Sequence, residues 1–199
     1  MRTSQIFFRS VQLTQGLVAA ALVLICTAHK ASAQYPHPAD ERGYIVRVGD
    51  AVPDFELVAL NGDTLSRTSL LGTTYVLQFT ASWCGVCRKE MPHLEEEVWK
   101  AFGGPAFTLI GVDLDEPADK VQTFAQQMGI TYPIAPDPEG ELFYRIAGPK
   151  SGVTRNIVVN PEGTIVFLTR LFEAEEFEEM KRVIAQTVRQ TPTPTSPST

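Results

Sequence analysis

The hydrophobic positions of this chain fall into short apolar runs separated by amphipathic stretches, a pattern typical of an α/β domain. Residues 75–79 and 107–112 are apolar and rich in β-branched and aromatic side chains, which predicts two buried strands. The second run has no polar side, as expected in the middle of a covered parallel sheet. Residues 156–159 and 164–169 flank Asn160-Pro161-Glu162-Gly163 and predict an antiparallel pair. The pattern therefore predicts a central sheet of mixed strand direction.

Apolar positions at helical spacing predict three main helices. The first begins at Cys84 and continues to Phe102, with a kink at Pro92. The second covers residues 117–128. The third covers residues 172–188, and its sheet-facing positions are Phe172, Phe177, Met180, Val183, Ile184 and Val188.

The remaining segments carry shorter signals. Residues 55–58 and the run around Leu65 predict a β-hairpin, because Asn61-Gly62 accommodates the positive φ of a tight turn. Residues 132–140 are predicted to be a loop, and residues 142–146 a short helix.

One domain is expected over residues 49–189, a length that suffices for a single core. Residues 34–48 are predicted to be a linker that turns into an extended segment and carries no chemistry. Residues 190–199 are rich in proline, threonine and serine, which predicts a disordered tail.

The start of the chain has the pattern of a secretory signal peptide. Residues 1–33 combine basic side chains, a short apolar core and the cleavage pattern Ala31-Ser32-Ala33, so we expect export to the periplasm or the medium. The apolar core is shorter than the roughly 20 residues of a spanning helix. A retained N-terminal membrane anchor is therefore the alternative.

Removal of this segment changes the charge and the cysteine count. Three of the 17 basic residues are lost and all 23 acidic residues stay, so the formal net charge falls from −6 to −9. We expect no binding to nucleic acid at a surface of this sign. Cys26 is lost as well, which leaves Cys84 and Cys87 as one pair. A single pair at the start of a helix is not the pattern of a disulfide-stabilised scaffold.

Cys84 and Cys87 follow the strand 75–79 and open the first helix, where they share one face. The free N–H groups and the dipole of a helix start favour a thiolate at Cys84. We therefore expect Cys84 to attack a disulfide and Cys87 to resolve the mixed disulfide. A zinc site would need a second pair of ligands, and a purely structural disulfide is the other alternative.

Beyond the cysteines, residues 49–189 resemble the TlpA/ResA-type thiol-disulfide oxidoreductases of bacterial envelopes, thioredoxin-like proteins within the AhpC/TSA–Redoxin superfamily. The resemblance rests on Pro53-Asp54-Phe55-Glu56-Leu57, Trp83, Glu90, Pro92 and Asn160-Pro161-Glu162-Gly163. It implies a thioredoxin-like three-layer α/β/α fold whose central mixed sheet is extended by an N-terminal β-hairpin. It further implies the redox-active disulfide Cys84–Cys87 without a cofactor or metal, protein thiol or disulfide substrates, and a membrane-bound thiol reductase as electron donor. We expect the protein to reduce disulfides of exported proteins such as apocytochrome c. We also expect it to be a monomer.

The resemblance also assigns roles to residues near the pair. It implies that Glu90 handles protons for the buried thiol; the other interpretation is an exposed glutamate paired with a lysine. Trp83 is expected to cover the disulfide and to contribute to substrate docking. Thr154, preceded by Val153, takes the place of the family's cis-proline, and both are expected to dock substrate. A cis bond before a non-proline residue costs about 2.5–4 kcal/mol, so we expect a trans bond; Arg155 next to it could face either the site or the surface.

Fewer residues of the sequence support the alternative functions. A peroxiredoxin-like peroxidase would carry Pro-X-X-X-Thr-X-X-Cys, but Leu77 and Ala81 occupy those positions. A disulfide oxidant or isomerase would use the same cysteines, and a redox-inactive binding module would not be expected to keep them. Asp113, Asp115 and Glu116 could form a metal site, but carboxylates before Pro117 are more typical of a helix N-terminus.

Overall fold

The computed structural model describes residues 39–190. The predicted signal peptide, its alternative as an anchor, and residues 191–199 of the predicted tail lie outside the described residues. Within 39–190, no helix combines the length and the apolar character that a membrane crossing requires.

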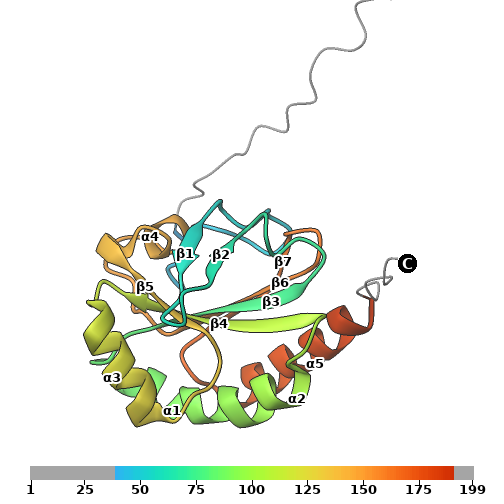
Figure 1. Cartoon of the computed structure of the whole chain (residues 1–199). Coiled ribbons are helices and arrows are strands. Elements are labelled where there is room, and N and C mark those ends of the chain that lie inside the picture. Colours follow the sequence, from blue (N-terminus) through green and yellow to red (C-terminus); the bar gives the residue numbers. More distant parts are fainter. Residues whose placement is uncertain (1–38, 191–199) are drawn as a thin grey trace, which may run out of the picture. The chain divides into compact units, whose positions relative to one another are not determined.

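A five-stranded mixed sheet forms the centre of the domain, with the strand order β5-β4-β3-β6-β7 (Figure 1). Its strands are β3 (Thr74–Thr80), β4 (Phe107–Leu114), β5 (Ile134–Asp137), β6 (Arg155–Val159) and β7 (Ile165–Arg170). The β3–β4 and β4–β5 pairs are parallel, and the β3–β6 and β6–β7 pairs are antiparallel. The predicted mixed sheet is confirmed, and its central strand β3 is fully buried.

The prediction of a loop over residues 132–140 is wrong, because the middle of this segment forms strand β5. This strand is four residues long, contains Pro136 and lies at the edge of the sheet. Proline is tolerated on an edge strand, where one side of the backbone needs no partner. A short run with a proline carries little strand signal in sequence, although its pairing with β4 is regular.

The helices cover the sheet on both faces. The first predicted helix is continuous in sequence but divided into α1 (Gly85–His93), the π-helical segment η1 (Leu94–Trp99) and α2 (Lys100–Phe102). The remaining helical elements are α3 (Ala118–Met128), the 3-10 turn η2 (Pro138–Gly140), α4 (Phe143–Ile146) and α5 (Ala174–Gln190). The break at Pro92 takes the form of a switch to π-helical geometry just after it, since proline cannot donate the backbone hydrogen bond of an α-helix.

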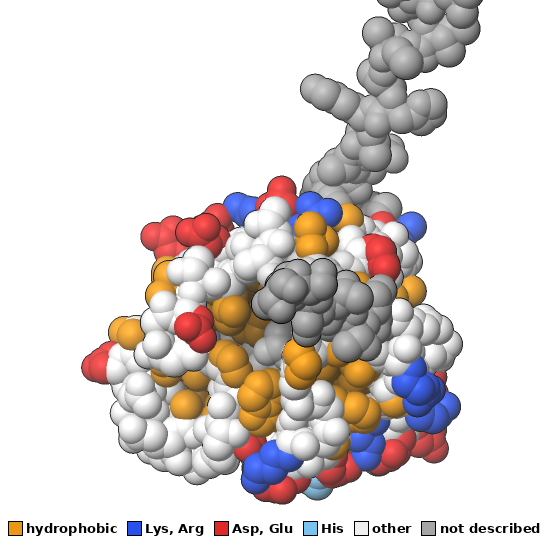
Figure 2. Space-filling view, turned by 45° about the vertical axis from the view of Figure 1, so that its right-hand side comes forward, with side chains coloured by type: hydrophobic (Ala, Val, Ile, Leu, Met, Phe, Trp, Pro, Cys, Tyr) orange, Lys and Arg blue, Asp and Glu red, His pale blue; other side chains and the backbone are white. Residues whose placement is uncertain are grey.

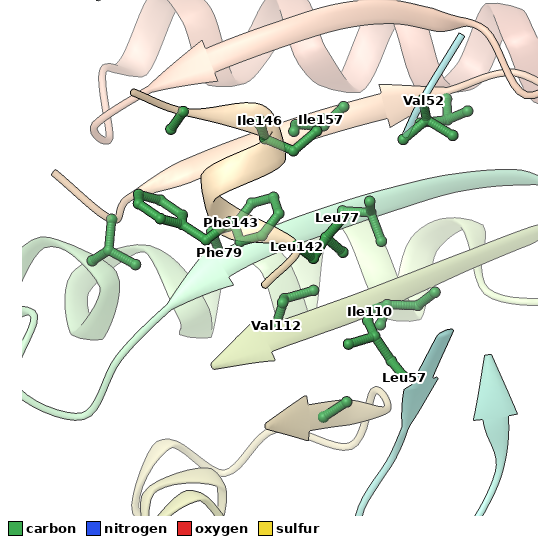
Figure 3. Packing of buried hydrophobic residues seen from close by; sticks show 14 of the residues in the cluster. Val52, Leu57, Leu77, Phe79, Ile110, Val112, Leu142, Phe143, Ile146 and Ile157 are labelled. Carbon is green, nitrogen blue, oxygen red and sulfur yellow. The ribbon is translucent and has the colours of Figure 1, made fainter. Parts of the chain in front are cut away.

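The alternation of side chains along β3 and β6 divides the interior into two cores. Helices α1, α3 and α5 pack on one face of the sheet, on the lower side of Figure 1, against residues such as Val76 and Val158. The other face packs against α4, the hairpin and the N-terminal segment. Figure 3 shows this second core, with Leu77 and Phe79 of β3 next to Phe143 of α4.

Residues 39–48 are not a linker, which corrects the expected domain boundary at residue 49. Tyr44 and Val46 are each only 1% exposed and belong to the second core. The Tyr44 hydroxyl donates a hydrogen bond to the carbonyl oxygen of Thr169, and Tyr44 pairs with Ala147 in an isolated bridge. The segment therefore forms part of the folded domain.

The predicted hairpin is present as β1 (Glu56–Val58) and β2 (Thr64–Ser66), with Gly62 at a φ of 90° in the turn. It forms a separate two-stranded sheet and does not extend the central sheet as the resemblance implied. A hydrogen bond from the backbone N–H of Leu60 to the carbonyl of Ile134, 2.9 Å long, links the hairpin to β5.

Candidate active site

Cys84 and Cys87 form a disulfide at the start of α1, with their Cα atoms 5.3 Å apart. Cys84 is the N-cap of this helix, and its Sγ accepts a hydrogen bond of 3.2 Å from the backbone N–H of Cys87. Cys84 is 7% exposed and Cys87 is completely buried. An incoming sulfur can therefore reach Cys84 more readily than Cys87.

The loop before Cys84 is held in place by the side chains of Glu116 and Arg88. Glu116 is 6% exposed and accepts hydrogen bonds from the backbone N–H and the hydroxyl of Ser82, at 2.5 and 2.8 Å. Arg88 of α1 donates a hydrogen bond of 2.8 Å to the Ser82 carbonyl, and its guanidinium lies over the ring of Phe124. Glu116, just before α3, and Arg88 of α1 thus both hold the loop at Ser82.

Thr154 lies against the disulfide, immediately before β6. Its Oγ1 is 3.2 Å from Sγ of Cys84 and 3.3 Å from Sγ of Cys87. The Thr154 carbonyl accepts hydrogen bonds from the backbone N–H of Leu171 and the side chain of Arg170, which hold this position in place. The residue expected at the cis-proline position therefore does face the cysteine pair.

The other two expected docking residues differ in exposure. Trp83 is 64% exposed beside Cys84, so its ring is accessible to another protein. The side chain of Val153 is 3% exposed and packs into the second core. Only the backbone of Val153 is therefore a candidate for contact with substrate.

Glu90 is buried one turn after Cys87 in α1 and is 1% exposed. Its Oε1 accepts a hydrogen bond of 2.6 Å from Nδ2 of Asn156, and its Oε2 has no hydrogen-bond partner within residues 39–190. Burial raises the pKa of Glu90 to about 8, although the hydrogen bond from Asn156 lowers it. The interpretation as an exposed glutamate paired with a lysine is wrong.

Further polar side chains surround Glu90 in this core. Asn156 also donates to the Thr169 hydroxyl at 2.9 Å, and it is the cross-strand partner of Gln78. Gln78 accepts a hydrogen bond of 3.3 Å from the hydroxyl of Tyr132. Burial, and then the charge of Glu90, raise the pKa of Tyr132. Together these residues form a buried polar cluster beneath α1.

Of the three acidic residues expected near the start of α3, Asp113 lies within β4, and Glu116 directly precedes the N-cap Pro117, to which no side chain of residues 39–190 gives a capping hydrogen bond. Burial, reinforced by the neighbouring Glu116, raises the pKa of Asp113 to about 8. Burial alone would raise the pKa of Glu116, but hydrogen bonds from Lys120 and Ser82 hold it below its usual value. Within the described range, no cluster of three or more histidine, cysteine or carboxylate side chains is arranged to hold a metal ion.

Arg155 lies neither at the surface nor at the disulfide, the two positions that the sequence left open. It is completely buried, with its guanidinium 4.2 Å from the ring centre of Tyr44. Its Nη2 donates a hydrogen bond of 2.9 Å to the carbonyl of Arg42. Alternation along β6 explains the difference: Arg155 points to the N-terminal segment, and Asn156 points to α1.

Sequence reasoning missed Ser82, Gln78 and Asn156, and it named Glu116 without its contact to the loop before Cys84. Gln78 and Asn156 interrupt apolar strands, and a polar residue in a buried strand is a signal that could have marked them. Ser82 and Glu116 carry no such signal, because 34 residues separate them in sequence.

On the face shown in Figure 2, lysine and arginine side chains lie among aspartate and glutamate side chains.

Sequence and structure comparisons place this domain among known proteins. The AhpC/TSA family model matches residues 48–168. The thiol-disulfide oxidoreductase ResA of Oceanobacillus iheyensis is 31% identical over 127 residues, which cover 61% of this chain and 64% of the relative, less than two thirds of its length.

Two solved structures support the fold. A proposed protein disulfide isomerase of Bacteroides thetaiotaomicron is 46% identical, with a TM-score of 0.71, and the match covers 74% of this chain and 93% of that one. A proposed thiol:disulfide interchange protein DsbE of Chlorobium tepidum is 25% identical, with a TM-score of 0.63, over 72% of this chain and 99% of that one. The thioredoxin-like α/β fold is confirmed, and the chain belongs to the AhpC/TSA family.

Proposed function

We propose that this protein is a thiol-disulfide oxidoreductase that reduces disulfides of other proteins. The observation that carries the proposal is the Cys84–Cys87 pair at the start of α1, with the more exposed sulfur at the helix tip. The curated relative is named a thiol-disulfide oxidoreductase, and the two solved neighbours are described as a proposed protein disulfide isomerase and a proposed thiol:disulfide interchange protein.

The reaction begins with the reduced pair. The Cys84 thiolate attacks one sulfur of a substrate disulfide, the substrate S–S bond breaks, and the other substrate sulfur leaves as a thiolate that takes up a proton. The Cys87 thiol then loses its proton and attacks Cys84. The second substrate sulfur leaves and is protonated, so the substrate gains two electrons and two protons and the Cys84–Cys87 disulfide forms.

Glu90 is the proposed acceptor of the Cys87 proton. Both side chains lie on the buried side of α1, one turn apart. A carboxyl group with a pKa of about 8 is closely matched to a thiol with an ordinary pKa of about 8.5, so transfer between them is nearly balanced in energy. Once ionised Glu90 has accepted this proton it is neutral, so it adds no charge that would oppose the Cys87 thiolate.

Disulfide isomerisation is the second candidate, because the solved neighbour at 46% identity is described as a proposed isomerase. Isomerisation begins with the same attack by Cys84 but returns the electrons to the substrate. A substrate sulfur, in place of Cys87, then attacks the mixed disulfide. The two activities differ in whether the Cys84–Cys87 disulfide accumulates during turnover.

The proposed setting follows from the N-terminal pattern. Cleavage after Ala33 would deliver the protein to the periplasm or the medium, with a retained anchor as the alternative. There the pair would act as a monomer on exported proteins, including apocytochrome c, and a membrane-bound thiol reductase would return it to the dithiol form.

Trapping tests the function directly. Reduced Cys87→Ser protein mixed with a disulfide-bonded protein should accumulate a mixed disulfide through Cys84, and Cys84→Ser should not. Wild-type protein should instead release reduced substrate and accumulate its own disulfide. Failure of both variants to form a mixed disulfide, or accumulation only in Cys84→Ser, would contradict the proposed roles.

A further inference from the structure

The contact between Thr154 and the disulfide has a definite hydrogen-bond direction. Disulfide sulfurs carry no hydrogen, so the Thr154 hydroxyl is the donor in its contacts of 3.2 Å with Cys84 and 3.3 Å with Cys87. Both distances lie within the range of hydrogen bonds to sulfur. One hydroxyl hydrogen is thus shared between two acceptors at nearly equal distance.

Thr154 is well placed to keep this contact through a reaction cycle. The residue is 2% exposed, and its carbonyl accepts hydrogen bonds of 3.2 Å from the N–H of Leu171 and 3.3 Å from the side chain of Arg170. Rotation about one side-chain bond redirects the hydroxyl hydrogen without movement of the backbone. The donor can therefore follow the negative charge from one sulfur to the other.

We propose that the Thr154 hydroxyl is a catalytic hydrogen-bond donor that serves the two sulfurs in turn, an inference that rests on the proposed function. Before attack it donates to the Cys84 thiolate, together with the backbone N–H of Cys87. When Cys84 is bound to substrate and Cys87 has lost its proton, the hydroxyl donates to the Cys87 thiolate. A proline at this position would have no hydrogen to give.

Hydrogen bonds to charged acceptors are stronger than those to neutral ones, so the donor stabilises the thiolate more than the thiol or the disulfide. Its removal should raise the pKa of Cys84. Because reduced protein with ionised Cys84 loses stabilisation, the couple should also become more reducing. Both changes concern the sulfurs alone, and they do not require a natural substrate.

The test compares Thr154→Val, which removes the hydroxyl and keeps the shape, with Thr154→Ser, which keeps the hydroxyl. Alkylation rates of the reduced proteins are measured across pH with iodoacetamide, and reduction potentials by equilibration with glutathione buffers. Thr154→Val should raise the Cys84 pKa by about one unit and lower the potential by about 30 mV, a tenfold change in each equilibrium. Thr154→Ser should stay within about threefold of wild type, that is, within about half a pKa unit.

Thr80→Val is the matched control, because the buried Thr80 hydroxyl contacts Sδ of Met91 and neither cysteine. It should leave both measurements unchanged. Equal values for wild type and Thr154→Val, or equal shifts in the Val and Ser variants, would overturn the inference. The proposed function fails separately, if wild-type protein does not exchange disulfides with the glutathione buffer or with a protein substrate.

Discussion

Glu90 and Asp113 are both buried carboxyl groups with pKa values raised to about 8, yet they are connected to different parts of the site. Glu90 lies on α1 with Cys87 and is bound by Asn156 of β6. Asp113 lies on β4, on the other side of the central strand, and faces Glu116. Burial alone therefore does not identify a proton-transfer group; the proposed role of Glu90 rests on its place one turn after Cys87 in α1.

We propose that Glu90 takes part in proton transfer, whereas Asp113 and Glu116 fix the geometry of the loop before Cys84. Glu116 holds the backbone of Ser82, two residues before Cys84, and stays ionised through Lys120. Asp113, which stays protonated near neutral pH, avoids a second negative charge next to Glu116.

The largest effect is expected in the pH dependence of stability. The folded protein keeps protons on Glu90 and Asp113 that the unfolded chain loses above its ordinary pKa values of about 4, so stability should fall as pH rises from about 5 to 8. Each group can contribute about 1.4 kcal/mol per pH unit in this window. Urea unfolding of the oxidised protein at a series of pH values measures this change in stability.

Glu90→Gln and Asp113→Asn should each remove part of this slope and be more stable than wild type at pH 8. A wild-type stability that stays constant over the window would show that neither carboxyl has a raised pKa. A slope that only one variant reduces would assign the effect to that residue.

The next effect separates the two carboxyls in catalysis. Glu90→Gln should slow the resolution of the mixed disulfide at neutral pH by about 100-fold, because it removes the proton acceptor for Cys87. Asp113→Asn should slow it by less than about tenfold. Rapid quenching of the reaction with a labelled disulfide peptide measures the step.

Glu96→Gln is the matched control, since Glu96 lies in η1 with its side chain 65% exposed and paired with Lys100. It should leave the rate unchanged. A larger loss in Asp113→Asn than in Glu90→Gln would reverse the assignment.

A smaller effect is expected from the loop contact. Ser82→Ala removes one of the two hydrogen bonds that Ser82 donates to the Glu116 carboxylate and should lower the free energy of unfolding by about 1.5–3 kcal/mol. Amide hydrogen exchange at Trp83 and Cys84 should accelerate while exchange in β6 stays slow. Unchanged exchange in the loop would show that Glu116 does not hold it.

The smallest effect concerns the hydrogen bond to Glu90. Asn156→Ala removes a donor that lowers the pKa of Glu90, so this pKa should rise further, by about one unit. The midpoint of the pH dependence of resolution reports the shift. A downward shift would mean that water entering the space left by the amide outweighs the lost hydrogen bond.

Much of the fold was predictable because it depends on local pattern. The continuous apolar run of residues 75–79 indicates a strand that is buried on both faces. The period of 3.6 in residues 172–188 indicates a helix with one buried face. Strand β5 and the segment around Tyr44 were missed, because both are held by pairing with distant parts of the chain.

The site divides in the same way. The positions of Cys84 and Cys87 follow from motif spacing, the position of Thr154 was implied by the family resemblance, and Thr154 does contact the sulfurs. The partners of Glu90 and Ser82 depend on how β4, β6 and α1 are stacked, which spacing along the chain does not specify. The contacts of polar side chains between the sheet and the helices therefore could not be predicted from the sequence.

The reduction potential of the Cys84–Cys87 couple tests the central claim most directly. Equilibration of the wild-type protein with glutathione or dithiothreitol buffers, followed by thiol labelling, gives this value. The proposed reductant should have a potential of about −200 to −300 mV, in the range of thioredoxins and glutaredoxins. A value near −120 mV, typical of a strong disulfide oxidant, or a disulfide that these buffers do not reduce, would contradict it.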